Sequence, residues 1–177
     1  MTVPTPDVAT IHAEMERARD EFHGLIAKSS PADLSRLSNG TRWTNRELLF
    51  HMLLGYLVTR NVIPLFKIVS SLPIPVRRGF AALLNAGTQP FDQINYWGSR
   101  AGARVLTPRR MLRWFDRVVS SLHRHLDHES SAALQRRMAF PSRWDPYFAD
   151  WMSLADAYHY PTLHFDHHER QLTVNLD

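Results

Sequence analysis

"YHYPTLHFDHHERQL", residues 158–172, is the stretch around which the chain is organised. Four of the ten histidines lie here, between His159 and His168, and the chain has no cysteine. His164 and His168 are four residues apart, so on a helix both rings lie on one face, one turn apart. They can bind a single ion if a third ligand comes from elsewhere. The alternative is a solvated cluster near a C-terminus, where protonated imidazole interacts favourably with the helix dipole.

The composition predicts one globular domain that spans residues 1–177. Hydrophobic residues make up 44% and charged residues 21% of the 177-residue chain, both close to globular averages. The absence of cysteine excludes disulfides, thiolate metal sites and cysteine nucleophiles, so imidazole and carboxylate must supply any strong chemistry. No N-terminal run has the pattern of a secretion signal, and we expect a cytoplasmic protein.

The formal net charge of +4 raises the hypothesis of nucleic-acid binding. The basic residues are dispersed as pairs, such as Arg77–Arg78 and Arg136–Arg137, without a basic tail or zinc-finger spacing. We therefore expect a modestly positive surface and no specific nucleic-acid partner. Prolines and Lys67 interrupt the apolar stretch 62–84, which argues against a membrane span.

Two helices are expected in the first part of the chain. Apolar residues recur every three or four positions from Val8 to Leu25, after a cap-and-proline start at Thr5–Pro6. A second helix begins at Thr44, which forms a capping-box pattern with a glutamate three residues on. This helix is apolar nearly all round, so it should be the most buried, and Pro64 should kink or end it.

Two further helices are expected in the second part. Thr107–Pro108 opens one with an apolar face that reaches Leu126, and Ser153 with Asp156 opens the last, in which Pro161 should cause a bend. The segments between these helices, including the proline-containing stretch 70–80, the aromatic stretch 85–100 and the loop 141–151, are expected to be irregular connections. The fold predicted is an all-α four-helix bundle with a long crossover connection and short extra helices.

His51 lies within the apolar run of the second helix, seven residues after its cap. A buried imidazole needs partners for its nitrogens, so it is either hydrogen-bonded in the core or bound to a metal. The other histidines have ordinary interpretations: His12 and His23 lie at the edge of an apolar stripe, and His125 and His128 lie among charged residues and should be solvated.

Two motifs resemble those of the DinB/YfiT-like superfamily, which includes thiol-dependent transferases and mycothiol-dependent maleylpyruvate isomerase-like proteins. The first is W-T-x3-L-x2-H, formed by Trp43, Thr44, Leu48 and His51. The second is H-x2-H-H-x2-Q-L, formed by His164, His167, His168, Gln171 and Leu172.

The resemblance implies that His51, His164 and His168 bind a divalent ion, zinc or nickel, with one coordination position left open. It implies that His167 is not a ligand and that Gln171 or Glu169 orients the ligating rings. It further implies a small-molecule substrate and a low-molecular-weight thiol cosubstrate, with arginines attracting an anionic partner. It identifies neither a catalytic residue nor a binding residue for that cosubstrate.

Alternatives to a thiol-dependent transferase or isomerase stay open. They are a hydrolase, a metal-binding bundle without turnover, and a metal-free structural or interaction domain. A homodimer is compatible with all of them. Asp166 and Glu169 are not expected to bind the ion, because their offsets from His164 turn them away from its face by roughly 160° and 140°.

Overall fold

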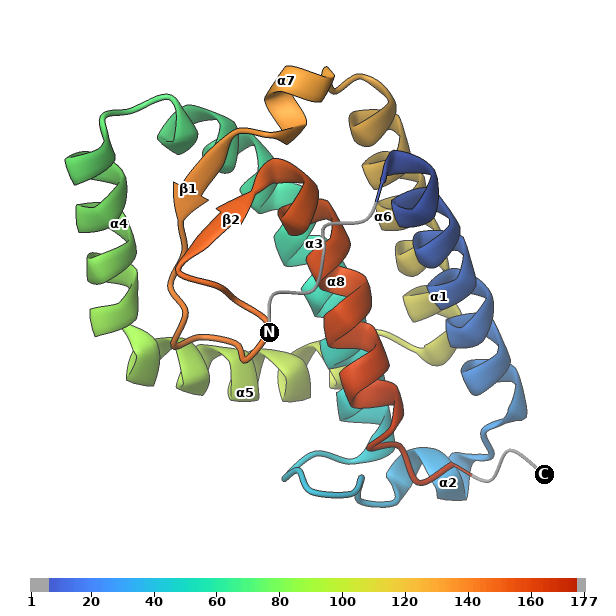
Figure 1. Ribbon diagram of the computed structural model, residues 1–177. Helices are drawn as coiled ribbons and strands as arrows, with labels where there is room; N and C mark the ends of the chain where they lie inside the picture. Colours follow the sequence, from blue (N-terminus) through green and yellow to red (C-terminus); the bar gives the residue numbers. More distant parts are fainter. Residues whose placement is uncertain (1–6, 175–177) are drawn as a thin grey trace.

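Four helices form a bundle in the computed structural model, which describes residues 7–174 (Figure 1). They are α1 (Val8–Lys28), α3 (Asn45–Ser70), α6 (Pro108–Asp127) and α8 (Leu154–Glu169). Helix α1 packs against α6 and α8, and α3 packs against the same two helices, so the four enclose one core. The predicted all-α four-helix bundle is confirmed.

The helix starts follow the capping signals of the sequence. Thr44 and Ser153 each accept a hydrogen bond from the backbone N–H three residues on, and the acidic side chain there accepts one from the backbone N–H of the cap residue. Thr107 caps α6 through the N–H of Arg110. The start predicted at Thr5–Pro6 lies outside the described residues, and α1 is capped by the side chain of Asp7.

The core lies where the apolar stripes of the four helices meet. Phe22 of α1 and Phe115 of α6 are fully buried and stack with their ring centroids 4.4 Å apart. Tyr56 of α3 packs on Phe115, and its hydroxyl lies 2.9 Å from that of Thr162 on α8. Every residue of the stripe predicted for α1 from position 11 onward is buried, namely Ile11, Met15, Ala18, Phe22 and Leu25.

Helix α3 is the centre of the molecule. Within residues 7–174 it is the one helix long and apolar enough to cross a membrane by length and composition. Its contacts with α5, α6 and α8 account for much of that apolar character, because a helix that packs against several neighbours buries side chains on more than one face.

The prediction that Pro64 ends or kinks this helix was wrong about the end, since α3 continues to Ser70. Pro64 is exposed, whereas its neighbours Ile63 and Phe66 are buried in the core. Burying each of two large apolar side chains is worth roughly 1.5–3 kcal/mol, which offsets the ~3 kcal/mol cost of an interior proline. In the same way α8 continues through the buried Pro161 as one helix.

The crossover is mostly helical, and the expectation of irregular connections at 70–80 and 85–100 was wrong for most of both stretches. These segments belong to α4 (Ile74–Ala86) and α5 (Thr88–Val105). Pro75 lies in the first turn of α4, where a missing N–H costs no helical hydrogen bond, so it is a start signal. Helix α5 packs against α3, and α4 stands beside the bundle (Figure 1).

Two short helices and two short strands complete the chain between the long helices. Helices α2 (Pro31–Ser35) and α7 (Ser131–Leu134) are the short extra helices that were expected. Strands β1 (Arg137–Ala139) and β2 (Trp151–Ser153) pair antiparallel, with Met138 opposite Met152. The sequence did not predict this hairpin, because strands of three residues are too short to show a period of two. Its loop, residues 140–150, lies near α4, α5 and α8 (Figure 1).

Candidate metal centre

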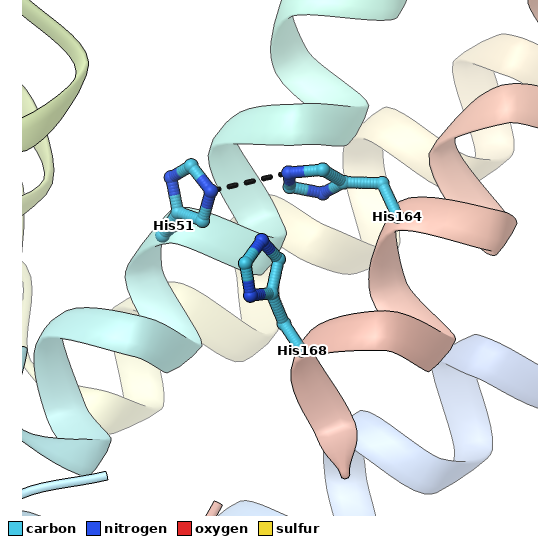
Figure 2. A group of neighbouring side chains, drawn as sticks. All are labelled: His51, His164 and His168. Carbon is cyan, nitrogen blue, oxygen red and sulfur yellow. Dashed lines mark hydrogen bonds between the residues drawn. The ribbon is translucent and has the colours of Figure 1, made fainter. Parts of the chain in front are cut away.

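Three histidines from two helices converge inside the bundle. The rings of His51 on α3 and of His164 and His168 on α8 point toward one another (Figure 2). One nitrogen from each ring lies within 4.8 Å of the others, and Nε2 of His51 is 3.1 Å from Nε2 of His164. His51 and His164 are each 5% exposed. The structure therefore brings together the three residues that the resemblance selected.

Helix geometry explains this convergence. His164 and His168 are one turn apart on α8, and their ring centroids lie 4.5 Å from each other. Helix α3 runs directly alongside α8 and presents His51 to the pair. Gly55, one turn after His51, gives the room: a Cβ at this position would lie 2.8 Å from Nδ1 of His164.

Two further side chains orient the rings so that Nε2 faces the centre. Nδ1 of His51 lies 3.2 Å from the hydroxyl of Ser99 on α5, and Nδ1 of His168 lies 2.7 Å from Oε1 of Gln171. An amide oxygen only accepts hydrogen bonds, so Nδ1 of His168 donates and its Nε2 keeps a free lone pair. Such contacts are the usual means by which proteins orient ligating imidazoles.

Gln171 therefore has the contact expected of it, whereas Glu169 does not contact the three rings. Glu169 lies in a separate acidic group with Glu21 and Asp166. The carboxylate of Asp166 accepts two hydrogen bonds from Arg17. Ser99 was missed in the sequence, because nothing marked the segment around it as a helix packed on α3.

Burial keeps the three imidazoles neutral. Removal from water lowers the pKa of His51 to about 3 and that of His168 to about 4. Burial also lowers the pKa of His164 well below its ordinary value, and the neighbouring histidines add to the shift. Each of the three rings therefore offers an unprotonated nitrogen at neutral pH, which is the form that binds a metal ion.

The donor set fits a divalent ion. Two nitrogens bound to one tetrahedral zinc at ~2.0–2.1 Å would lie ~3.4 Å apart, close to the observed 3.1 Å between His51 and His164. The Nδ1 atom of His164 is buried and has no hydrogen-bond partner among the described residues. Packing within the core therefore leaves one nitrogen of this ring without a hydrogen bond. Within residues 7–174, no carboxylate belongs to this group of three.

The other histidines that the sequence analysis discussed do not belong to this group of three. His167 is half-buried beside the group, with Nδ1 3.3 Å from the Tyr147 hydroxyl. His12 pairs with His123 and Asp127, and His23 pairs with Asp116, all at the edges of α1 and α6. His125 and His128 are exposed.

A cavity of about 490 Å³ opens beside the three rings, and all three line it. This volume falls within the ~300–1,000 Å³ typical of small-molecule sites. Its walls come from α3, α4, α5, α8 and the hairpin loop, so the crossover and the loop that the sequence left unassigned form most of the chamber.

Asp145 brings a carboxylate from the hairpin loop to the polar end of this cavity. Its Oδ2 lies 3.9 Å from Nε2 of His164 and accepts a hydrogen bond of 2.9 Å from the Tyr160 hydroxyl. Burial raises the pKa of Asp145. Sequence reasoning missed this residue, because no local pattern shows that the loop folds back over α8.

Fold and site together define a class: helical-bundle proteins in which neutral histidines from two adjacent helices meet at the base of a cavity. The sequence profile of the DinB superfamily matches residues 6–172, and the chain belongs to this family. Searches among curated proteins and among solved structures found no significant match.

Proposed function

We propose that His51, His164 and His168 bind one divalent ion, zinc or nickel, and that this centre catalyses a transfer or isomerisation that depends on a low-molecular-weight thiol. The observation that carries the proposal is the convergence of three neutral imidazoles on one point at the base of a cavity. Three protein ligands with an accessible further position are the arrangement of catalytic zinc sites, whereas structural sites are closed by four.

The chemistry follows from charge. When bound, an ion held by neutral ligands keeps its full positive charge and supplies a Lewis acid that lowers the pKa of a thiol or water. Ser99 and Gln171 hold the rings of His51 and His168 in the required orientation. Oδ2 of Asp145 is an acceptor within the cavity for the proton that such a nucleophile releases.

The thiol must come from solution, because the protein has no cysteine. In line with the sequence, we propose that thiol and acceptor are both small molecules and that the protein acts in the cytoplasm. A relationship to mycothiol-dependent isomerases or to YfiT-like transferases is part of this proposal.

The first test is metal content. Protein purified without chelator should contain about one zinc or nickel ion per chain by elemental analysis, and His51→Ala should contain almost none. His125→Ala is the matched control, because His125 is an exposed histidine that belongs neither to the group of three nor to the cavity lining. Full metal content in His51→Ala would show that the assignment is wrong.

The second test concerns the thiol. In cobalt-substituted protein, low-molecular-weight thiols should add a charge-transfer band to the absorption spectrum, and a screen with electrophilic acceptors should then show turnover. A spectrum that responds to water or carboxylate ligands but to no thiol would contradict the thiol-dependent function. The remaining hypotheses would then be a hydrolase and a metal-binding bundle without turnover. If the purified protein binds no metal at all, the remaining hypothesis is a structural or interaction domain.

A further inference from the structure

The chamber beyond the three histidines has an unusual chemical composition. Its walls are aromatic and aliphatic, contributed by five separate parts of the chain. Phe91 of α5 and Trp144 of the hairpin loop stack with centroids 3.9 Å apart and planes at 10°, which gives one wall a flat aromatic surface. Val62 of α3 and Leu84 of α4 are among the aliphatic residues that line the chamber.

Charge is nearly absent from this lining. Among the described residues that line the chamber there is no lysine or arginine, and Asp145 is the one carboxylate. Two arginines outside the lining have partners of their own: Arg100 pairs with Glu47, and Arg42 lies over the ring of Tyr96. An anion in the chamber would therefore lose its hydration without meeting a lysine or arginine, and it would approach a carboxylate.

The polar groups gather at one end. Asp145 accepts hydrogen bonds from the Tyr160 hydroxyl and from the backbone N–H of Tyr147, both of 2.9 Å, and these hold its carboxylate beside His164. A molecule in the chamber thus meets a carboxylate and imidazoles that lie together. The rest of the lining is mostly apolar and includes the polar side chains of Thr59 and Asn95.

We propose that the acceptor substrate of this protein is an uncharged organic molecule with an apolar, planar or alkyl body and one hydrogen-bonding end. The body lies between the apolar walls, and the polar end faces Asp145 and the three histidines. As the substrate of a metal centre this molecule rests on the function proposed above, but its binding to the chamber requires no metal.

The experiment compares ligands that differ only in charge. Binding of 2-naphthalenemethanol and 1-octanol, and of the anions 2-naphthoate and octanoate, is measured by calorimetry on metal-free and zinc-loaded protein. In the metal-free protein at least one alcohol should bind with a dissociation constant at least tenfold lower than its matching anion. Equal binding of alcohol and anion, or no binding of either alcohol, would overturn the proposal.

Variants of the lining test whether the alcohol binds inside the chamber. Val62→Trp and Leu84→Trp should weaken binding of the alcohol at least tenfold, because each fills the chamber from a different helix. Val76→Trp is the matched control: Val76 is 50% exposed, lies on α4 outside the lining, and its replacement should leave binding unchanged. Circular dichroism and the melting temperature verify that each variant is folded. If Val76→Trp weakens binding as much as Val62→Trp and Leu84→Trp do, the ligand lies elsewhere and the proposal fails.

The two proposals can fail separately. Alcohol binding by protein that takes up no metal would disprove the metal centre and leave the chamber assignment intact. Stoichiometric metal binding by protein that binds neither alcohol would support the metal centre and disprove the assignment of the chamber. Asp145→Asn should reduce, by several fold, the ratio between the dissociation constants of the anion and of its matching alcohol. An unchanged ratio would show that the carboxylate of Asp145 is not the cause of the preference for the alcohol.

Discussion

Nε2 of His51 lies 3.1 Å from Nε2 of His164, although 113 positions separate the two residues in the chain. Two imidazole nitrogens at this distance must share a proton or a cation, since two lone pairs facing each other repel. Burial disfavours a charged ring, so without an ion one neutral ring donates an N–H···N hydrogen bond to the other, and a divalent ion bound to both nitrogens would take the place of that proton. The contact explains why metal binding at this point is the central prediction.

The neighbouring histidines of α8 should differ in their effect on metal binding. His168→Ala should lower the affinity for zinc by at least tenfold, because it removes one of three converging nitrogens. His167→Ala should retain nearly full affinity, since His167 contacts Tyr147 and is not in the group. Competition titration with a chromogenic chelator measures both, and the reverse order would assign the ligand role to His167.

Ser99 should act through the ring of His51. Its hydroxyl contacts Nδ1 of His51, and loss of such an orienting contact typically lowers metal affinity by ~10–100-fold. Ser99→Ala should show this loss with little change in the melting temperature of the metal-free protein. Ser121→Ala, which changes a buried serine of α6, is the control. Unaltered zinc affinity in Ser99→Ala would mean that packing alone orients His51.

Gly55 should be needed for the position of His164. In Gly55→Ala the new Cβ would lie 2.8 Å from Nδ1 and 3.2 Å from Cε1 of His164, so the ring must move. We expect weaker zinc binding by tenfold or more. Gly24→Ala in α1, where a Cβ meets nothing within 4 Å, should bind zinc normally and gain about 0.5–1 kcal/mol of stability. Normal zinc affinity in Gly55→Ala would contradict the geometry.

Acid should destabilise the metal-free protein between about pH 6.5 and 4. The folded-state pKa values of His51 and His168, about 3 and 4, lie below the unfolded value of 6.5, so the unfolded chain binds more protons over this interval. Stability from these groups is fully present well above pH 6.5 and falls as the pH falls, by up to roughly 1.4 kcal/mol per pH unit for each histidine.

Urea unfolding at pH 7, 6 and 5 measures this dependence. His168→Asn should reduce the slope, and His125→Asn, which changes an exposed histidine, should not. Comparing variants cancels the contributions of carboxylates such as Asp145. Equal slopes in the wild type and His168→Asn would show that His168 is not held neutral by burial.

The sequence by itself determined the local features. The stripe from Ile11 to Leu25, the capping boxes at Thr44 and Ser153, and the spacing of His164 and His168 depend on interactions within a few residues, so they can be read from the chain. The motifs also selected His51 as their partner, through resemblance and not through spacing.

Only the tertiary structure decided how distant parts meet. Helix α3 passes through Pro64 because burial of Ile63 and Phe66 outweighs the local cost of proline. Ser99 and Asp145 reach the histidines because α5 packs on α3 and the hairpin loop folds over the cavity. Local hydrogen bonds and side-chain periodicity fix single helices, whereas the site depends on packing between segments far apart in the chain, which no short window of sequence contains.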